Sequence, residues 1–273
     1  MDTLLTLLPR FGFSTSVFYR GDFCGQNQFR ASDGVGQLHL VRKGTVHMLH
    51  RQGPPLHVLE PSLVFYPRAF DHQLVVPAGE PVSLLCANVR FAHATHNPIA
   101  QALPDVMCVP LAGADGLSAT LELLMAEEAA DDIGKELIVD GLCGVLVVHL
   151  IRHAWKANMI SKGVLAGLSD LQLAPVLSAL HADPGRPWPL QDMAALARMS
   201  RTTFINRFRD VVGMAPARYL TGWRMNLARS LLLEGRSVKE VALTVGYRHQ
   251  PAFSKAFSSW CGMAPTEWLR QPS

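Results

Sequence analysis

The sequence has no long apolar run, few cysteines and few charged residues, and each shortage excludes a class of protein. The longest apolar segment, residues 141–148, is far short of the ~20 residues that span a bilayer. The N-terminus lacks the positive start of an export signal, and Pro9 and Arg10 interrupt its short apolar stretch. We therefore expect a cytoplasmic protein whose five cysteines are thiols and not a disulfide framework.

Motifs of enzyme active sites are also missing. No Ser/His/Asp triad, phosphate-binding loop or catalytic pair of carboxylates stands out in the sequence, so we expect no enzyme activity and no cofactor. The 273 residues suffice for two domains, and a composition that is 49% hydrophobic and 17% charged allows a sizeable core.

Charge is distributed unevenly along the chain. From Ser169 onward there are 13 Lys/Arg and 7 Asp/Glu, a net charge of +6, whereas the preceding part carries −3. A basic C-terminal third is typical of contact with nucleic-acid phosphates.

A repeat at a fixed offset organises this basic third. Two phenylalanines, a glycine, a proline and a further aromatic residue recur with spacings of 4, 5, 3 and 3 at an offset of 49 residues. A repeat of this kind indicates one small supersecondary unit used twice. The first copy is Phe204, Phe208, Gly213, Pro216 and Tyr219, and the second is Phe253, Phe257, Gly262, Pro265 and Trp268.

Each copy ends a predicted pair of helices. In the first unit, a short amphipathic helix over 190–197 precedes a helix from about 201 to 212, with Ser200 as its N-cap and Gly213 as its left-handed stop. The second unit has helices over 238–245 and about 250–261. Two helices joined by a short turn indicate a helix-turn-helix.

Helical geometry predicts which side chains of the second helices face outward. At about 100° per residue, the paired phenylalanines turn to the partner helix and the small, polar or cationic residues turn away. Such a face suits the major groove of DNA. A predicted helix over 216–233, with Pro216 in its first turn, spans roughly 27 Å and can hold two recognition helices about one DNA turn, ~34 Å, apart.

Residues 171–270 resemble the DNA-binding domain of the AraC/XylS family of bacterial transcription regulators. The resemblance rests on both units, the connecting helix, the Gly246-Tyr247 turn and the glycine–proline–aromatic ends. It implies base contacts from Thr202, Ile205 and Asn206, and from Pro251, Ala252 and Lys255 in the second unit. Since Pro251 and Ala252 carry no side-chain donor, we expect the second unit to read fewer bases and to hold phosphate. The predicted DNA-binding residues are Arg201, Thr202, Thr203, Ile205, Asn206, Arg209, Arg248, His249, Gln250 and Lys255.

The first 110 residues predict a β-sandwich or barrel. Short alternating apolar runs over 37–41, 46–50, 56–59, 63–66, 72–76 and 82–91 are separated by Gly and Pro. Their order resembles the cupin barrel at the front of AraC-type regulators. The predicted fold class is thus α+β with two domains, a cupin-like β-barrel plus helices followed by an all-α double helix-turn-helix.

The metal-binding pattern of cupin enzymes is incomplete here. His39 and His72 match two of the usual four ligands, but Val41 replaces a second histidine of the His-x-His pair and no glutamate follows at the right spacing. We therefore predict no metal, with His39 and His72 as the only candidates, and interpret both as polar residues of a barrel mouth. A cupin metalloenzyme remains the remote alternative.

Cys24 and Cys86 are the candidate sensing residues. The whole chain resembles, in element order and length, members of the family that sense reactive chlorine species such as hypochlorous acid. The resemblance implies that Cys24, in an arm before the barrel, pairs with Cys86 on oxidation through a sulfenic acid and so changes DNA binding. The alternative is a small organic ligand in the barrel, and Cys86 can also be a simple core residue. Cys108, Cys143 and Cys261 are interpreted as structural.

Two helices are predicted between the barrel and the basic domain, over 117–130 and 133–157, with Asp131 and Asp132 able to cap the second. In the family they pack on the barrel and form a dimer seam, so we expect a homodimer, with packing within one chain only as the alternative. The predicted regulator is an activator, with RNA polymerase as a further partner and no membrane. The expected domains are a barrel over 1–110, helices over 111–160, a linker over 161–170 and a DNA-binding domain over 171–273, with units at 190–213 and 237–262.

Overall fold

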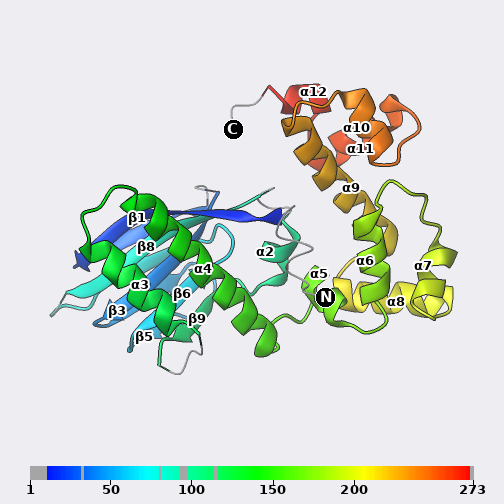
Figure 1. The fold of residues 1–273 in the computed structure, drawn as a ribbon. Helices are drawn as coiled ribbons and strands as arrows, with labels where there is room; N and C mark the ends of the chain where they lie inside the picture. Colours follow the sequence, from blue (N-terminus) through cyan, green and yellow to red (C-terminus); the bar gives the residue numbers. More distant parts are fainter. Residues whose placement is uncertain (1–10, 32–33, 80, 93–96, 113–115, 271–273) are drawn as a thin grey trace. The chain divides into compact units, whose positions relative to one another are not determined.

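The computed structural model describes residues 11–31, 34–79, 81–92, 97–112 and 116–270. Its contacts divide the chain into two compact units, one over Phe11–Ile160 and the other from Ser161 onward. The first unit contains the strands and the second contains only helices among its described residues (Figure 1).

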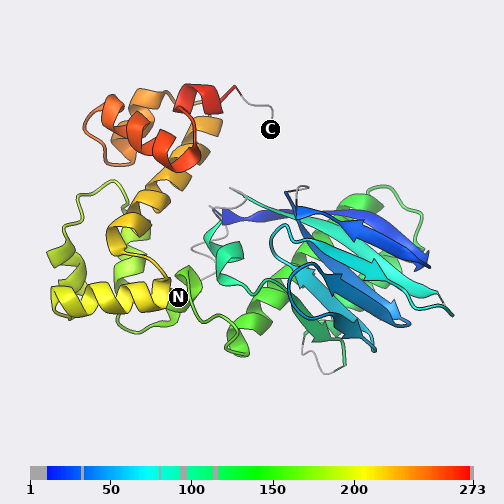
Figure 2. The same ribbon diagram turned by 180° about the vertical axis from the view of Figure 1, so that it is seen from behind.

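The first unit is built from two antiparallel sheets that enclose an apolar core. One sheet has the strand order β1-β8-β3-β6-β9 and the other the order β2-β7-β4-β5 (Figure 2). Side chains such as Val41, Met48 and Val64 fill the space between them. The strands are β1 (Phe13–Phe23), β2 (Gln26–Phe29), β3 (Gly36–Lys43), β4 (Val46–His50), β5 (Leu56–Val58), β6 (Ser62–Tyr66), β7 (His72–Val75), β8 (Val82–Phe91) and β9 (Met107–Pro110).

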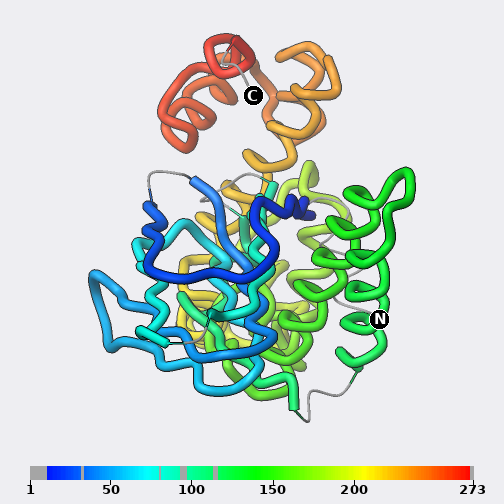
Figure 3. The backbone as a smooth tube through the Cα atoms, turned by 90° about the vertical axis from the view of Figure 1, so that its left-hand side faces the viewer, coloured from blue at the N-terminus to red at the C-terminus, as the bar shows by residue number. Residues whose placement is uncertain are grey.

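Helices α3 (Ser118–Ala129) and α4 (Lys135–Lys156) run side by side and cover the five-stranded sheet (Figures 1 and 3). Polar contacts fix α4 on β1, since the Asp140 carboxylate accepts from the Val17 amide at 2.7 Å and the Asp140 carbonyl accepts from the Thr15 hydroxyl. Because β6 is enclosed on both faces, all of its residues are buried. A short helix, α2 (Pro98–Ala102), precedes β9.

The six predicted strands all occur, but β1, β2 and β9 were not predicted. The prediction that Cys24 lies in an arm before the barrel is wrong. Cys24 lies between β1 and β2, which are both strands of the barrel. Helix α4 begins after Gly134 without a side-chain cap, so the predicted capping by Asp131 or Asp132 is wrong.

Helix α4 is long and apolar enough to cross a bilayer by length and composition, the one such helix in the part of the chain that the structure describes. The apolar run of 141–148 noted in the sequence is only a part of this helix, because Asp140 and His149 interrupt its apolar residues. Seven of its residues are buried, among them Leu146, Val147 and Leu150. It is therefore a core helix of the first unit that also leaves apolar residues exposed.

The second unit consists of eight helices over its described residues, and their bounds agree closely with the prediction from Leu190 onward. Residues 164–169, expected to belong to a linker, instead form α5, whose Val164 and Leu165 are buried. The apolar pattern over 171–181 also predicts a helix, which in the structure begins only at Ala174. The helices are α5 (Val164–Ser169), α6 (Ala174–Ala182), α7 (Leu190–Leu196), α8 (Arg201–Val212), α9 (Pro216–Leu233), α10 (Val238–Thr244), α11 (Gln250–Cys261) and α12 (Pro265–Trp268).

Candidate functional site

Local signals fix both ends of α8. The Ser200 side chain accepts from the Thr203 amide, and Gly213 takes a left-handed φ of 85° directly after the last turn. Phe204 and Phe208 are fully buried. The helix is therefore held by one apolar face, which determines the direction of all its other side chains.

The opposite face of α8 carries the residues predicted to contact DNA. Arg201, Thr202, Thr203, Asn206 and Arg209 are exposed, and Ile205 is half-buried. Their neighbour Arg207 points elsewhere, because its guanidinium binds the Asp170 carboxylate at 2.7 Å. The structure thus leaves the predicted residues of the first unit accessible, and Ile205 is the least exposed of them.

The second unit repeats this arrangement on α10 and α11. Ser237 and Glu240 form a capping box at the start of α10, and Phe253 and Phe257 are fully buried on α11. The exposed residues at the start of α11 include all those predicted to contact DNA. They are Arg248, His249, Gln250, Pro251, Ala252 and Lys255.

Contacts beyond α9 also join the two helical pairs. The Arg224 side chain on α9 donates to the carbonyls of Pro184 and Arg186, in the turn before α7. In the same place the backbones of Gly185 and Gly246 meet so closely that a Cβ on Gly246 would lie 2.4 Å from the Gly185 carbonyl oxygen. The turn of the second pair is therefore packed against the first, which fixes the relative placement of α8 and α11. The sequence predicts a turn at Gly246, but it does not predict the contact of that turn with Gly185 or the contacts of Arg224.

A chain of hydrogen bonds crosses the interior of the barrel. His39 Nδ1 lies 3.2 Å from Cys86 Sγ, His39 Nε2 lies 3.1 Å from His72 Nε2, and His72 Nδ1 lies 2.8 Å from the Phe70 carbonyl. The structure thus brings both predicted histidines together with one predicted cysteine. This contact follows from the register in which β3 pairs with β8, because that register places His39 opposite Cys86.

The proton positions along this series of hydrogen bonds follow from the Phe70 carbonyl at one end and the Cys86 thiol at the other. Burial lowers the pKa of His39 to about 3 and that of His72 to about 4, so both rings are neutral at pH 7. A carbonyl only accepts, so His72 carries its proton on Nδ1 and accepts at Nε2. His39 then donates from Nε2, and its bare Nδ1 accepts the thiol proton of Cys86. Burial raises the pKa of that thiol to about 12.

Cys24 and Cys86 occupy different environments and lie apart. Cys24 is exposed and Cys86 is buried, and both are free thiols. Phe23 pairs with Val82, four residues from Cys86, which places the two cysteines on the order of 13 Å apart along the strands. A disulfide requires Cα atoms within about 7 Å, so pairing requires the end of β1 to move.

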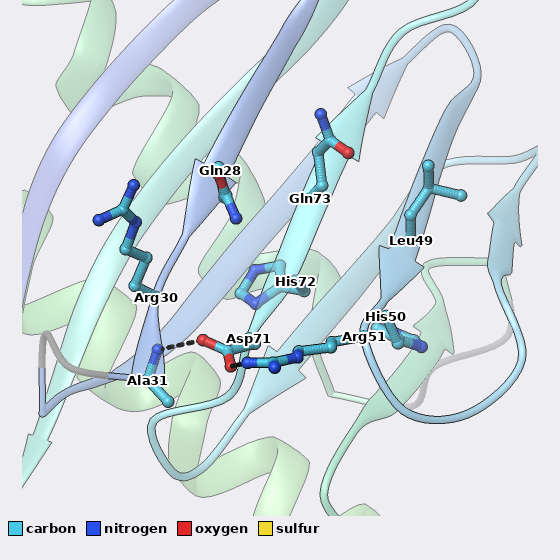
Figure 4. A pocket seen from close by; sticks show the side chains of 9 residues that line it. All are labelled: Gln28, Arg30, Ala31, Leu49, His50, Arg51, Asp71, His72 and Gln73. Carbon is cyan, nitrogen blue, oxygen red and sulfur yellow. Dashed lines mark hydrogen bonds and ion pairs between the residues drawn. The ribbon is translucent and has the colours of Figure 1, made fainter.

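A hollow of about 600 Å³ lies beside β2, β4 and β7, around residues that include Arg30, Gln73 and His72 (Figure 4). Asp71 occupies part of its edge, where it accepts from the Ala31 amide at 2.7 Å and pairs with Arg51. Among the described residues there is no group of three or more His, Cys, Asp or Glu that could hold a metal ion.

Comparisons with known proteins agree with this two-part organisation. A cupin family model matches residues 2–156 and a helix-turn-helix domain model matches residues 193–271. A putative AraC-like transcription regulator of Streptomyces lividans is 33% identical over 88% of this chain and 83% of that protein. The RCS-specific HTH-type transcriptional activator RclR of Escherichia coli K12 is 24% identical over 86% of each chain. Among solved structures, the DNA-binding domain of AdpA in complex with a target DNA is 33% identical over 35% of this chain and 87% of that chain, with a TM-score of 0.34.

Proposed function

The chain belongs to the AraC-like transcription regulators, with a cupin domain before a helix-turn-helix domain, and we propose that it reads a specific double-stranded DNA sequence through α8 and α11. The observation that supports this most is the pair of helices with buried phenylalanines on one face and exposed polar residues on the other. A helix of this kind fits a major groove.

The two helices have different tasks in this proposal. Asn206 can read adenine and Arg209 can read guanine or bind phosphate, since amide and guanidinium groups pair with those base edges. In the second unit, Pro251 and Ala252 offer no side-chain donor. Arg248, Gln250 and Lys255 therefore mainly contact the phosphate backbone of the DNA. Selection of bound fragments from random duplex DNA tests the proposal. We expect enrichment of a defined sequence, and recovery without enrichment would contradict it.

We further propose that the cupin domain responds to oxidants such as reactive chlorine species through Cys24 and Cys86. The exposed Cys24 thiol reacts with hypochlorous acid to give a sulfenic acid and hydrogen chloride, and the sulfenic acid condenses with Cys86 and releases water. Because Cys24 follows the end of β1 and lies far along the strands from Cys86 on β8, the disulfide would pull the end of β1 from its register. The likeness to RclR, whose name describes an RCS-specific activator, supports this signal and an activating role with RNA polymerase as partner.

A homodimer is part of the same proposal, because α3 and α4 leave apolar side chains in water. Leu137 is 79% exposed and Met125 is 56% exposed, and such residues favour burial against a second copy. Sedimentation of Leu137→Asp tests this, with Leu59→Asp as the control, since Leu59 is 71% exposed and directly follows β5 of the other sheet. We expect only Leu137→Asp to shift the protein toward monomer. Unchanged sedimentation of that variant would show that α4 does not form the dimer interface.

A small organic ligand is the second candidate signal, and the hollow beside β2, β4 and β7 favours it. Its volume of about 600 Å³ lies within the range of ligand sites, and Arg30 and Gln73 offer polar contacts. The proposed protein acts in the cytoplasm, without catalysis and without a membrane partner. Retention of the oxidant response by variants that lack the two cysteines would favour the ligand.

A further inference from the structure

A second, smaller cavity leads from the surface to Cys86. It has a volume of about 100 Å³, and four aromatic side chains, two leucines and Asn27 line it together with the cysteine. Phe18 and Asn27 are exposed whereas Cys86 is buried, so the cavity opens at the first two and ends at the thiol. None of the described residues that line it bears a carboxylate, an ammonium or a guanidinium group.

The size and lining of this cavity restrict its occupant. An apolar cavity of roughly 150 Å³ holds benzene, so the occupant should have fewer heavy atoms than benzene. An anion would lose its hydration without gaining a cationic partner, and the cost of burying an unpaired charge is large. Small uncharged molecules are therefore the class that fits.

The thiol at the end of the cavity is already hydrogen-bonded to a base. Cys86 donates to the bare Nδ1 of His39, and the opposite ring nitrogen of His39 donates to His72. An unassisted thiol in this position would stay protonated, because burial disfavours its thiolate. Because burial also lowers the pKa of His39 to about 3, a separate imidazolium–thiolate pair is disfavoured. The thiol proton must therefore move to His39 Nδ1 in the same step in which the sulfur attacks.

We propose that Cys86, His39 and this cavity form a covalent capture site for small uncharged α,β-unsaturated carbonyl compounds. The Cys86 sulfur attacks the β-carbon while the thiol proton passes to His39 Nδ1. The π electrons move to the carbonyl oxygen as an enolate, and the proton is returned from His39, through water, to the α-carbon. A carbon–sulfur bond forms, every atom is retained, and no oxidant is needed. The inference goes beyond the proposed function, because it requires neither Cys24 nor a disulfide nor DNA.

Alkylation of the full-length protein tests the site, with exposed Cys24 as an internal reference. Acrylamide serves as the small uncharged unsaturated probe, and peptide mass spectrometry reports adducts at each cysteine. The uncharged iodoacetamide is then compared with the anionic iodoacetate. We expect acrylamide to label Cys86 in the folded protein, and we expect the iodoacetamide-to-iodoacetate rate ratio to be on the order of tenfold higher at Cys86 than at Cys24. Absence of a Cys86 adduct, or equal ratios at the two cysteines, would overturn the inference.

The role of His39 has its own test. His39→Asn keeps an acceptor near the thiol but removes the base, so labelling of Cys86 should slow by on the order of 100-fold while Cys24 labelling is unchanged. His57→Asn, on the exposed surface of the same unit, is the matched control and should change neither rate. Equal Cys86 labelling in wild type and a folded His39→Asn protein would refute the assignment of His39. The reagent ratio in the wild-type protein remains decisive if that variant does not fold. Since mass is the readout, failure of the DNA or oxidant proposals would not affect this result.

Discussion

Arg207 and Arg209 lie two residues apart on α8 but point to different surroundings. Arg207 is bound to Asp170 at 2.7 Å, whereas Arg209 and Asn206 belong to the exposed face opposite Phe204 and Phe208. The buried phenylalanines cause this difference, because they fix the rotation of the helix about its axis. A matched pair of arginine variants can therefore separate a role in DNA binding from a general effect of charge.

Replacing Asn206 or Arg209 by alanine should weaken binding to the selected DNA. A lost base contact costs about 1–3 kcal/mol, which is roughly a 5- to 150-fold rise in Kd. Fluorescence anisotropy with a labelled duplex measures the change. Arg207→Ala is the control and should leave the affinity nearly unchanged, since its guanidinium binds the Asp170 carboxylate and makes no predicted DNA contact. Unaltered affinity in both Asn206→Ala and Arg209→Ala would show that this face does not meet the bases.

Serine in place of Cys24 or Cys86 should abolish the change in DNA affinity that follows exposure to hypochlorous acid. Either substitution removes one sulfur of the proposed disulfide, and the folded core tolerates serine best at the exposed Cys24. The measurement compares operator affinity before and after oxidant for each variant. Cys108→Ser, in the same unit, is the control that should respond as wild type. A full response in both single variants would show that a disulfide between Cys24 and Cys86 does not mediate the response.

Individual residues of the thiol site could be predicted, but their connection could not. The sequence indicated His39, His72 and Cys86 separately, because their types and strand-like surroundings are visible in it. The bond from Cys86 to His39 depends on the pairing of β3 with β8, and the two residues are 47 positions apart along the chain. The same limit explains the wrong placement of Cys24 in an arm, since β1 carries Gly21 and Asp22 near its end and lacks a continuous apolar run.

At the scale of elements, the turn between α10 and α11 is held by backbone contact. Gly246 has a φ of 87°, and a side chain there would meet the Gly185 carbonyl. Gly262 has a nearly equal φ of 82°, but nothing lies within 4 Å of the place where its Cβ would be. The two glycines thus share one conformational requirement and differ in packing.

Gly246→Ala should destabilise the helical unit more than Gly262→Ala. Both variants force alanine into the left-handed region, which costs about 1–2 kcal/mol, and only Gly246→Ala adds overpacking of roughly 1–3 kcal/mol. Urea unfolding of the full chain, followed by tryptophan fluorescence, measures the difference. Gly246→Ala should also weaken binding to the selected DNA, because it disturbs the placement of α11 relative to α8. Equal stability of the two variants would show that the Gly185 contact is unimportant.

Elements with local signals could be predicted from the sequence almost to the residue. A cap, a stop or a proline marks the ends of α8 and α9, as Ser200, Gly213 and Pro216 show. Helix α5 has no such cap, so its sequence predicts a linker. Its residues Val164 and Leu165 are ordered by burial against α6 and α8, and this tertiary stabilisation leaves no short-range pattern.

In the molecule as a whole, the two units carry the two proposed functions separately. The first unit holds the thiols and the exposed apolar helix α4, and the second holds the two exposed helical faces and the excess of positive charge. Within the second unit, α9 has 18 residues and so a length of roughly 27 Å. It runs between the α7/α8 pair and the α10/α11 pair (Figure 1). Together with the Arg224 and Gly246 contacts, it should hold α8 and α11 at one spacing.

Footprinting of the full-length protein on its selected DNA, with methylation of guanine N7 as a probe of the major groove, tests the fixed spacing most directly. Two protected segments should lie on one face of the duplex with centres about 10 base pairs, or ~34 Å, apart. Asn206→Ala should remove protection in one segment only. A single protected segment, or two segments on opposite faces of the duplex, would contradict the account.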